Sequence, residues 1–226
     1  MTKNDMRLRA AKLTVPVMCG YLFLGTAFGA TLAQAGFGPA WALMMSGLIY
    51  AGSLQFVMVP LMAAGAGLAT AALTALMVNA RHLFYGVSYI ERFKRFPALV
   101  RPYMVFSLTD ETYSVFCSLP KDEENGVMIR VALYDQIYWV TGSVVGGLLA
   151  QQIPFDLTGI DFSMTALFIV ICVERALDSK GRLPLAIGGA CAIICLILLG
   201  PDAFLAPALA VTALLLTLLC RKGERA

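Results

Sequence analysis

Long uncharged apolar runs alternate with short clusters of charged residues along this chain. Hydrophobic residue types make up 59% of its 226 residues and charged types 14%, whereas about a quarter of the residues in a soluble domain are charged. A helix of ~20 apolar residues crosses a bilayer, so the chain has room for about six to eight membrane elements. The pattern therefore predicts an all-α polytopic membrane protein that forms one transmembrane domain over residues 1–226.

Positively charged residues gather in four segments, namely residues 1–12, 91–101, 174–182 and 221–226. Such segments accumulate on the cytoplasmic side of a membrane. We therefore expect a cytoplasmic N-terminus over residues 1–12 and a cytoplasmic tail over residues 221–226. The run 13–35 is too long for the apolar part of a signal peptide, and we expect it to be the first transmembrane helix. The net charge of +3 gives no sign of a nucleic-acid partner.

Two of the apolar runs are interrupted or short. The second run, residues 40–64, contains an uncharged polar cluster at residues 50–55, and the fourth, residues 103–119, is short. If every run simply spanned the bilayer, the basic segment 91–101 would fall on the wrong side. A second run that re-enters from outside and a fourth that re-enters from inside would correct this, as in a transporter built on inverted repeats. One alternative is an intact second helix whose polar residues bond to neighbouring helices. Another is a different division of the region 40–90 into helices, which would also move the basic segment to the cytoplasmic side.

Arg81 lies inside the third apolar run, residues 67–90, unlike any other of the seventeen Lys and Arg residues. His82 beside it is the only histidine of the chain. A fixed charge near the middle of a bilayer costs roughly 2.5–3.5 kcal/mol, so Arg81 requires an acidic partner or a functional role. Three acidic residues lie in or beside later apolar runs and are its candidate partners: Asp110, Glu111 and Asp135.

Small residues recur at intervals of four in the first and fifth runs. Gly25 and Gly29 share a helical face in the first run, and Gly142 and Gly146 share one in the fifth. Such spacing lets two membrane helices approach closely. Asp135 lies on the same face as the two later glycines, and we therefore expect its carboxylate to point into the helix bundle rather than at lipid.

The remaining features predict ordinary structural roles. Tyr138 and Trp139 resemble aromatic residues at a membrane interface, and the acidic loop 121–126 is expected to be exposed to solvent. We expect the cysteines to be packing residues, with no disulfide, metal site or cofactor. The six cysteines are Cys19, Cys117, Cys172, Cys191, Cys195 and Cys220.

The chain shows no soluble domain, nucleotide-binding loop or metal motif. Gly52 and Ser53 beside a lone histidine suggest an intramembrane serine protease, but Leu54 stands where that class has glycine. We therefore expect a protein that is not an enzyme. A helical membrane protein with a few intramembrane ionisable groups is most simply a secondary transporter. The alternative is a channel or facilitator for small neutral or ionic solutes.

Four segments resemble the AzlC family, the large subunit of branched-chain amino acid exporters in the LIV-E group. They are residues 24–29, 45–56, 78–85 and 108–113, in the order and spacing of the family. The resemblance implies proton-linked export of valine, leucine, isoleucine and sometimes methionine across the cell (inner) membrane. It also implies a small AzlD-type membrane subunit as a partner.

These arguments predict two groups of site residues. A zwitterionic substrate needs a cationic group or helix N-terminus for its carboxylate, an acceptor for its ammonium and an apolar pocket. Arg81 either holds the carboxylate directly or is neutralised by a carboxylate and positions the site. For proton coupling or ion pairing we expect Asp110, Glu111 or Asp135, with His82 as a second candidate for the proton. The expected substrate-binding residues are Tyr50, Gly52, Ser53, Gln55, Asn79, Arg81 and His82.

Overall fold

The computed structural model describes residues 2–152, 182–200 and 204–223, together with residues 169, 172, 173, 176 and 177. Within these residues all regular structure is helical, and no strand occurs among them. The chain divides into two compact units, Met1–Ser163 and Met164–Ala226. We describe each unit by itself.

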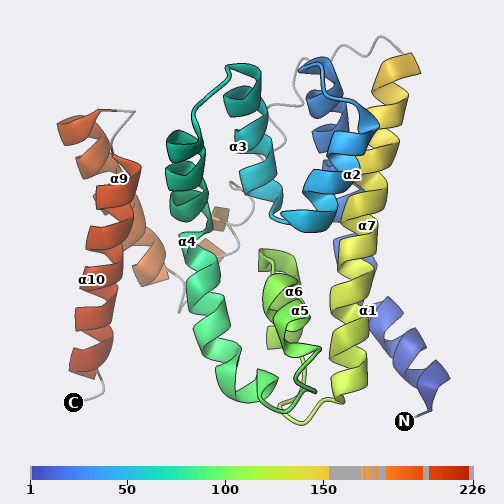
Figure 1. The fold of residues 1–226 in the computed structure, drawn as a ribbon. Helices are drawn as coiled ribbons and strands as arrows, with labels where there is room; N and C mark the ends of the chain where they lie inside the picture. The colour runs from blue at the N-terminus through green and yellow to red at the C-terminus, as the bar shows by residue number, and fades with distance from the viewer. Residues whose placement is uncertain are drawn as a thin grey trace. The chain divides into compact units, whose positions relative to one another are not determined.

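Over residues 2–152, the described part of the first unit, two long helices are each followed by two short ones, and a third long helix ends the series. In Figure 1, α1 and α4 run in opposite directions, and the two pairs of short helices fold back into the unit from opposite ends. The helices are α1 (Lys3–Gln34), α2 (Pro39–Leu48), α3 (Gly52–Ala63), α4 (Leu68–Phe93), α5 (Arg101–Phe106), α6 (Asp110–Cys117) and α7 (Asn125–Gln152).

The second apolar run is broken, as the first of the two alternatives predicts. We call residues 49–51, between α2 and α3, the first break. Tyr50 adopts a positive φ of 46°, which is uncommon for a residue other than glycine. Its N–H still donates to Met45 O at 3.2 Å, so Tyr50 closes α2 in the left-handed manner that ends many helices. The chain then reverses and α3 begins at Gly52.

The fourth apolar run is also broken, but without a left-handed residue. Residues 107–109, between α5 and α6, form the second break. Thr109 is the N-cap of α6, and its side chain accepts a hydrogen bond from Thr112 N. Asp110 and Glu111 occupy the first turn of α6, where negative charge is favourable.

Helices α1 and α7 pack backbone to backbone through the predicted small residues. A Cβ atom on Gly25 would lie 2.9 Å from Trp139 O, and one on Gly142 would lie 2.9 Å from Leu22 O. Cβ atoms on Gly29 and Gly146 would lie closer still to backbone atoms of the facing helix. The predicted close helix approach at these glycines is confirmed, and the structure adds that the two glycine faces pack against each other. This contact places Asp135 of α7 fully inside the protein.

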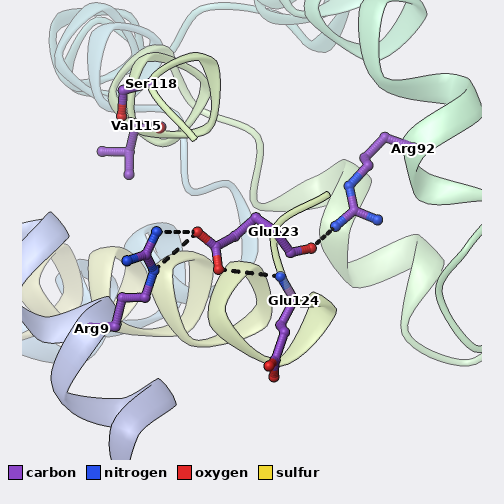
Figure 2. Close-up of polar contacts among 6 residues, drawn as sticks. All are labelled: Arg9, Arg92, Val115, Ser118, Glu123 and Glu124. Carbon is purple, nitrogen blue, oxygen red and sulfur yellow. Dashed lines mark hydrogen bonds and ion pairs between the residues drawn. The ribbon is translucent and has the colours of Figure 1, made fainter. Parts of the chain in front are cut away.

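Glu123 joins three segments at one end of the first unit (Figure 2). Its carboxylate accepts from Arg9 Nε at 3.0 Å and Arg9 Nη2 at 2.6 Å, and its backbone carbonyl accepts from Arg92. The predicted exposure of loop 121–126 is wrong for this residue, which is only 8% exposed. Arg9 compensates its charge, and that makes the burial possible. The start of α1 and the end of α4, both rich in basic residues, therefore lie at the same end of the unit.

In the second unit, the described ranges 182–200 and 204–223 form two helices that pack against each other. Helices α9 (Arg182–Leu199) and α10 (Leu205–Gly223) follow one another around Gly200, whose φ is 77°. Cys191 and Cys195 are both buried on α9, in agreement with a packing role. The predicted sixth run, residues 162–177, and the basic loop 174–182 lie mostly outside the described residues.

Two of the described helices are long and apolar enough to cross a membrane, Lys3–Gln34 and Arg182–Leu199. Shorter apolar helical stretches occur at Gly52–Ala63, Leu68–Asn79 and Ala210–Leu219. The expected six to eight membrane elements are therefore not confirmed as separate full-length spans. The two breaks account for part of this difference, because each half of a broken run is too short to span a bilayer alone.

Candidate functional site

The two helix breaks meet inside the first unit, beside α1. The Tyr50 ring of the first break lies 6.0 Å from the Phe106 ring and 6.5 Å from the Tyr21 ring, measured between centroids. The Tyr21 hydroxyl lies 2.7 Å from Thr109 Oγ1 of the second break. Tyr21 of α1 therefore contacts both breaks.

A chain of three hydroxyl groups connects two carboxylates at this meeting point, and we call it the hydroxyl chain. Tyr21 donates to Glu111 Oε2 at 2.7 Å and contacts Thr109 Oγ1 at 2.7 Å. Thr109 donates to Thr112 Oγ1 at 3.2 Å, and Thr112 donates to Asp135 Oδ2 at 2.8 Å. Tyr21, Thr109, Thr112 and Asp135 are all buried.

The hydroxyl chain can hold one acidic proton. Its four oxygen–oxygen contacts join three hydroxyl groups and two carboxyl groups. Each hydroxyl supplies a single proton, so three protons serve four contacts. All four contacts are hydrogen bonds only when either Glu111 or Asp135 is protonated. The geometry thus suits two carboxyl groups that share one proton.

Among the residues that the structure describes, three buried polar side-chain atoms have no hydrogen-bond partner: Tyr50 Oη, Asp135 Oδ1 and Asn79 Oδ1. Thr112 lies near the Tyr50 hydroxyl but outside hydrogen-bonding geometry. A buried polar atom without a partner costs about 1–3 kcal/mol, and more when it is charged. The meeting point of the two breaks therefore keeps an unused carboxylate oxygen and an unused hydroxyl.

Gln55 and Trp139 hold the first break against α7. Gln55 is fully buried, its Oε1 accepts from Trp139 Nε1 at 2.9 Å, and its Nε2 donates to Ser46 Oγ at 3.1 Å. The prediction that Trp139 lies at a membrane interface is wrong, because Gln55 satisfies its N–H inside the protein. A Cβ atom on Gly52 would lie 3.0 Å from the Trp139 ring, so the residue at position 52 must be small.

The stretch around Arg81 is helical throughout, as expected, and belongs to α4. The Arg81 side chain lies outside the described part of the structure. His82 Nδ1 lies 3.3 Å from Asn79 O, and its ring lies 5.7 Å from that of Tyr85. Tyr85 in turn stacks on Tyr113 at 4.4 Å, which joins α4 to α6.

Of the predicted site residues, the structure brings three together: Glu111 and Asp135 at the two ends of the hydroxyl chain, and Tyr50 beside it. Ser53, like Gln55, is buried in the first turn of α3. Reasoning from the sequence missed four residues of this region: Tyr21, Thr109, Thr112 and Trp139. Of these, only Thr109 has a usable signal, as a threonine directly before two acidic residues at a helix start.

Comparison with known proteins identifies the family of this chain. The sequence model of the family described as AzlC protein matches residues 16–153, which include both breaks and the whole hydroxyl chain. The chain belongs to the AzlC family. No solved structure matches it.

AzlC relatives align over most of their length. The branched-chain amino acid transport protein AzlC of Bacillus subtilis is 35% identical over 94% of this chain and 85% of its own length. An uncharacterized membrane protein of Haemophilus influenzae is 37% identical over 95% of this chain and 91% of its own. The inner membrane protein YgaZ of Escherichia coli is 31% identical over 72% and 70%. The chain is accordingly a membrane protein of a transport family, as predicted.

Proposed function

We propose that this AzlC-family chain is a secondary transporter that exports the branched-chain amino acids valine, leucine and isoleucine, and sometimes methionine. The observation that carries the proposal is the meeting of two broken helices at a buried polar site. Secondary transporters place their substrates at such breaks, where helix ends and freed backbone groups face the ligand. The name of the Bacillus subtilis relative supports this substrate class.

In the proposed membrane arrangement, α1, α4 and α7 span the bilayer while α2–α3 and α5–α6 re-enter from opposite faces. The order of one long and two short helices occurs twice, in α1–α3 and in α4–α6, which supports an inverted repeat. Residues 1–226 act as one transport domain of the inner membrane. The N-terminus is cytoplasmic, because the basic ends of α1 and α4 lie together.

The polar groups of the site suit a zwitterion. No side chain of the described residues caps the N-terminus of α3, where backbone N–H groups favour an anion such as a carboxylate. Ser53, Asn79 and His82 complete the proposed translocation path, together with Arg81, which is neutralised by an acidic residue or holds the carboxylate. Replacing Arg81 by Ala is expected to abolish efflux while the protein still inserts in the membrane.

Export is proton-coupled in this proposal, and the hydroxyl chain supports it. Glu111 and Asp135 share one proton across that chain, so protonation at one end alters the charge at the other. Asp110 in the same first turn of α6 is the further candidate for the coupled proton. A small AzlD-type membrane subunit acts with the chain, and large apolar side chains such as Leu48, Leu76 and Val87 are exposed for contact with lipid or with such a subunit.

Efflux from loaded cells tests this function. Cells expressing the chain, with and without a co-expressed small subunit, are loaded with labelled valine, leucine, isoleucine, methionine and alanine. We expect saturable efflux of the branched-chain amino acids, faster than in cells with empty vector and sensitive to an uncoupler. Efflux equal to that of empty vector would refute the proposal. Flux that grows linearly with concentration would instead indicate a channel.

A further inference from the structure

One carboxylate oxygen of Asp135 accepts a hydrogen bond, and the other has no hydrogen-bond partner. Oδ2 accepts from Thr112 at 2.8 Å, whereas Oδ1 is buried and has no hydrogen-bond partner. The residue is 0% exposed. An ionised carboxylate buried in this way needs a compensating positive charge, and the structure leaves a single oxygen free to receive it.

The Tyr50 hydroxyl is the second unsatisfied polar group at the meeting point of the two breaks. Tyr50 is 3% exposed and its hydroxyl has no hydrogen-bond partner. It lies next to Thr112, the residue that holds the other oxygen of Asp135, and Asp135 acts on it electrostatically. Two buried, unsatisfied oxygen atoms therefore lie around one threonine, at the meeting point of the two helix breaks.

The surroundings favour a cation as the missing ligand. The Tyr50 ring lies 6.0 Å from Phe106 and 6.5 Å from Tyr21, and the Tyr21 ring lies 5.2 Å from Trp139. Aromatic faces attract an ammonium group and repel an anion. A carboxylate oxygen, a hydroxyl and aromatic rings together form a site for a primary ammonium.

We propose that Asp135 Oδ1 and the Tyr50 hydroxyl bind the ammonium group of the transported amino acid. The inference rests on the proposed function, which it deepens by assigning the group that recognises the amine. Tyr50 lies two residues before the start of α3, whose N-terminus has no side-chain cap, and we assign the carboxylate of the same amino acid to the backbone N–H groups there. Asp135 is thereby a substrate-binding residue rather than only a partner for Arg81 or a carrier of the coupled proton.

Two analogues of leucine separate the recognition of its two charged ends. Isopentylamine carries the ammonium and the branched side chain, and 4-methylpentanoate carries the carboxylate and the branched side chain. Each is measured for binding to the purified full-length wild-type protein and to Asp135→Asn. The amide keeps the shape of the carboxylate and can still accept from Thr112, but it removes the negative charge. Asp122→Asn is the matched control, because Asp122 is an exposed carboxylate outside the site.

We expect Asp135→Asn to weaken isopentylamine binding by at least about tenfold, or roughly 1.4 kcal/mol, while binding of 4-methylpentanoate changes little. Tyr50→Phe removes only the hydroxyl and should weaken amine binding by a smaller factor. This variant decides the question if Asp135→Asn is not recovered in a folded form. Amine binding as tight in both variants as in wild type would overturn the inference. Equal loss of both analogues in Asp135→Asn would also overturn it, because that result shows general damage to the site.

Failure of the proposed transport function and failure of the ammonium site give different results. If the wild-type protein binds isopentylamine and loses it on Asp135→Asn but transports no branched-chain amino acid, the ammonium site stands and the assigned substrate is wrong. If wild type transports leucine and Asp135→Asn keeps full amine affinity, the transport function stands and the ammonium site is wrong.

Discussion

Thr112 donates a hydrogen bond to Asp135 across 2.8 Å in the interior of the protein, and this bond joins the second helix break to α7. It belongs to the hydroxyl chain that reaches Glu111 through Tyr21. Two segments separated by 23 residues in sequence thus become one polar unit.

Replacing Thr112 by Val should destabilise the protein and uncouple the two carboxylates. Valine has nearly the shape of threonine but supplies no hydroxyl, so both oxygens of Asp135 become unsatisfied at a cost of about 1–3 kcal/mol. The melting temperature of the purified protein in detergent and the pH dependence of leucine efflux measure the two effects. Ser114→Ala, at an exposed position of the same helix, should change neither. An unchanged pH profile of leucine efflux in Thr112→Val would show that the hydroxyl chain does not couple the two carboxylates.

Replacing Trp139 by Phe should destabilise the first break. The substitution leaves Gln55 Oε1 buried without its donor, which costs about 1–3 kcal/mol. Gln55→Leu in the same protein should recover part of the loss, because two apolar partners leave nothing unsatisfied between them. Thermal unfolding of both single variants and of the double variant measures this interaction. Strictly additive losses would show that the bond contributes nothing.

Two glycines of α1 offer a matched comparison of helix packing. A Cβ atom on Gly29 would collide with the backbone of Ser143, whereas one on Gly20 would meet nothing within 4 Å. Gly29→Ala should therefore lower stability by about 1–3 kcal/mol or more through overpacking. Gly20→Ala should be neutral or stabilising by about 0.5–1 kcal/mol, since alanine favours helix. Equal melting temperatures of the two variants would contradict the close contact of α1 with α7.

The ion pair at the basic end of the first unit predicts an unequal effect of two carboxylate substitutions. Glu123→Gln removes the charge that accepts two hydrogen bonds from Arg9 and should cost about 1–3 kcal/mol. Glu91→Gln removes a carboxylate that is 84% exposed and paired with Lys94, and exposed pairs contribute about 0–1 kcal/mol. Denaturation of the two variants at equal ionic strength checks the difference. A larger loss of stability in Glu91→Gln than in Glu123→Gln would contradict the structural role of the Arg9–Glu123 ion pair.

The features that depend on local pattern could be predicted from the sequence. The four-residue spacing of Gly25 and Gly29 gave the close helix contact, and the polar cluster at residues 50–55 gave the first break. The inward direction of Asp135 followed from the face that it shares with Gly142 and Gly146. Each of these depends only on neighbours within a few turns of the same helix.

The features that depend on distant partners could not be predicted from the sequence. Glu123 is buried because Arg9, 114 residues earlier, neutralises it. Trp139 is a core residue because Gln55, 84 residues away, accepts its N–H. Tyr21 is a lone tyrosine in an apolar helix, and nothing in the surrounding sequence distinguishes it from a packing residue. Its role emerges only where both breaks meet.

Counterflow of leucine tests the central claim most directly. Proteoliposomes that contain the purified chain, with and without a small subunit, are loaded with unlabelled leucine and diluted into a trace of labelled leucine. The proposed transporter predicts a transient accumulation of label above its external concentration, because a carrier exchanges one bound substrate for another. It also predicts that alanine inside the vesicles supports less accumulation than leucine. Label that only equilibrates, at the same rate as in protein-free liposomes, would contradict the account.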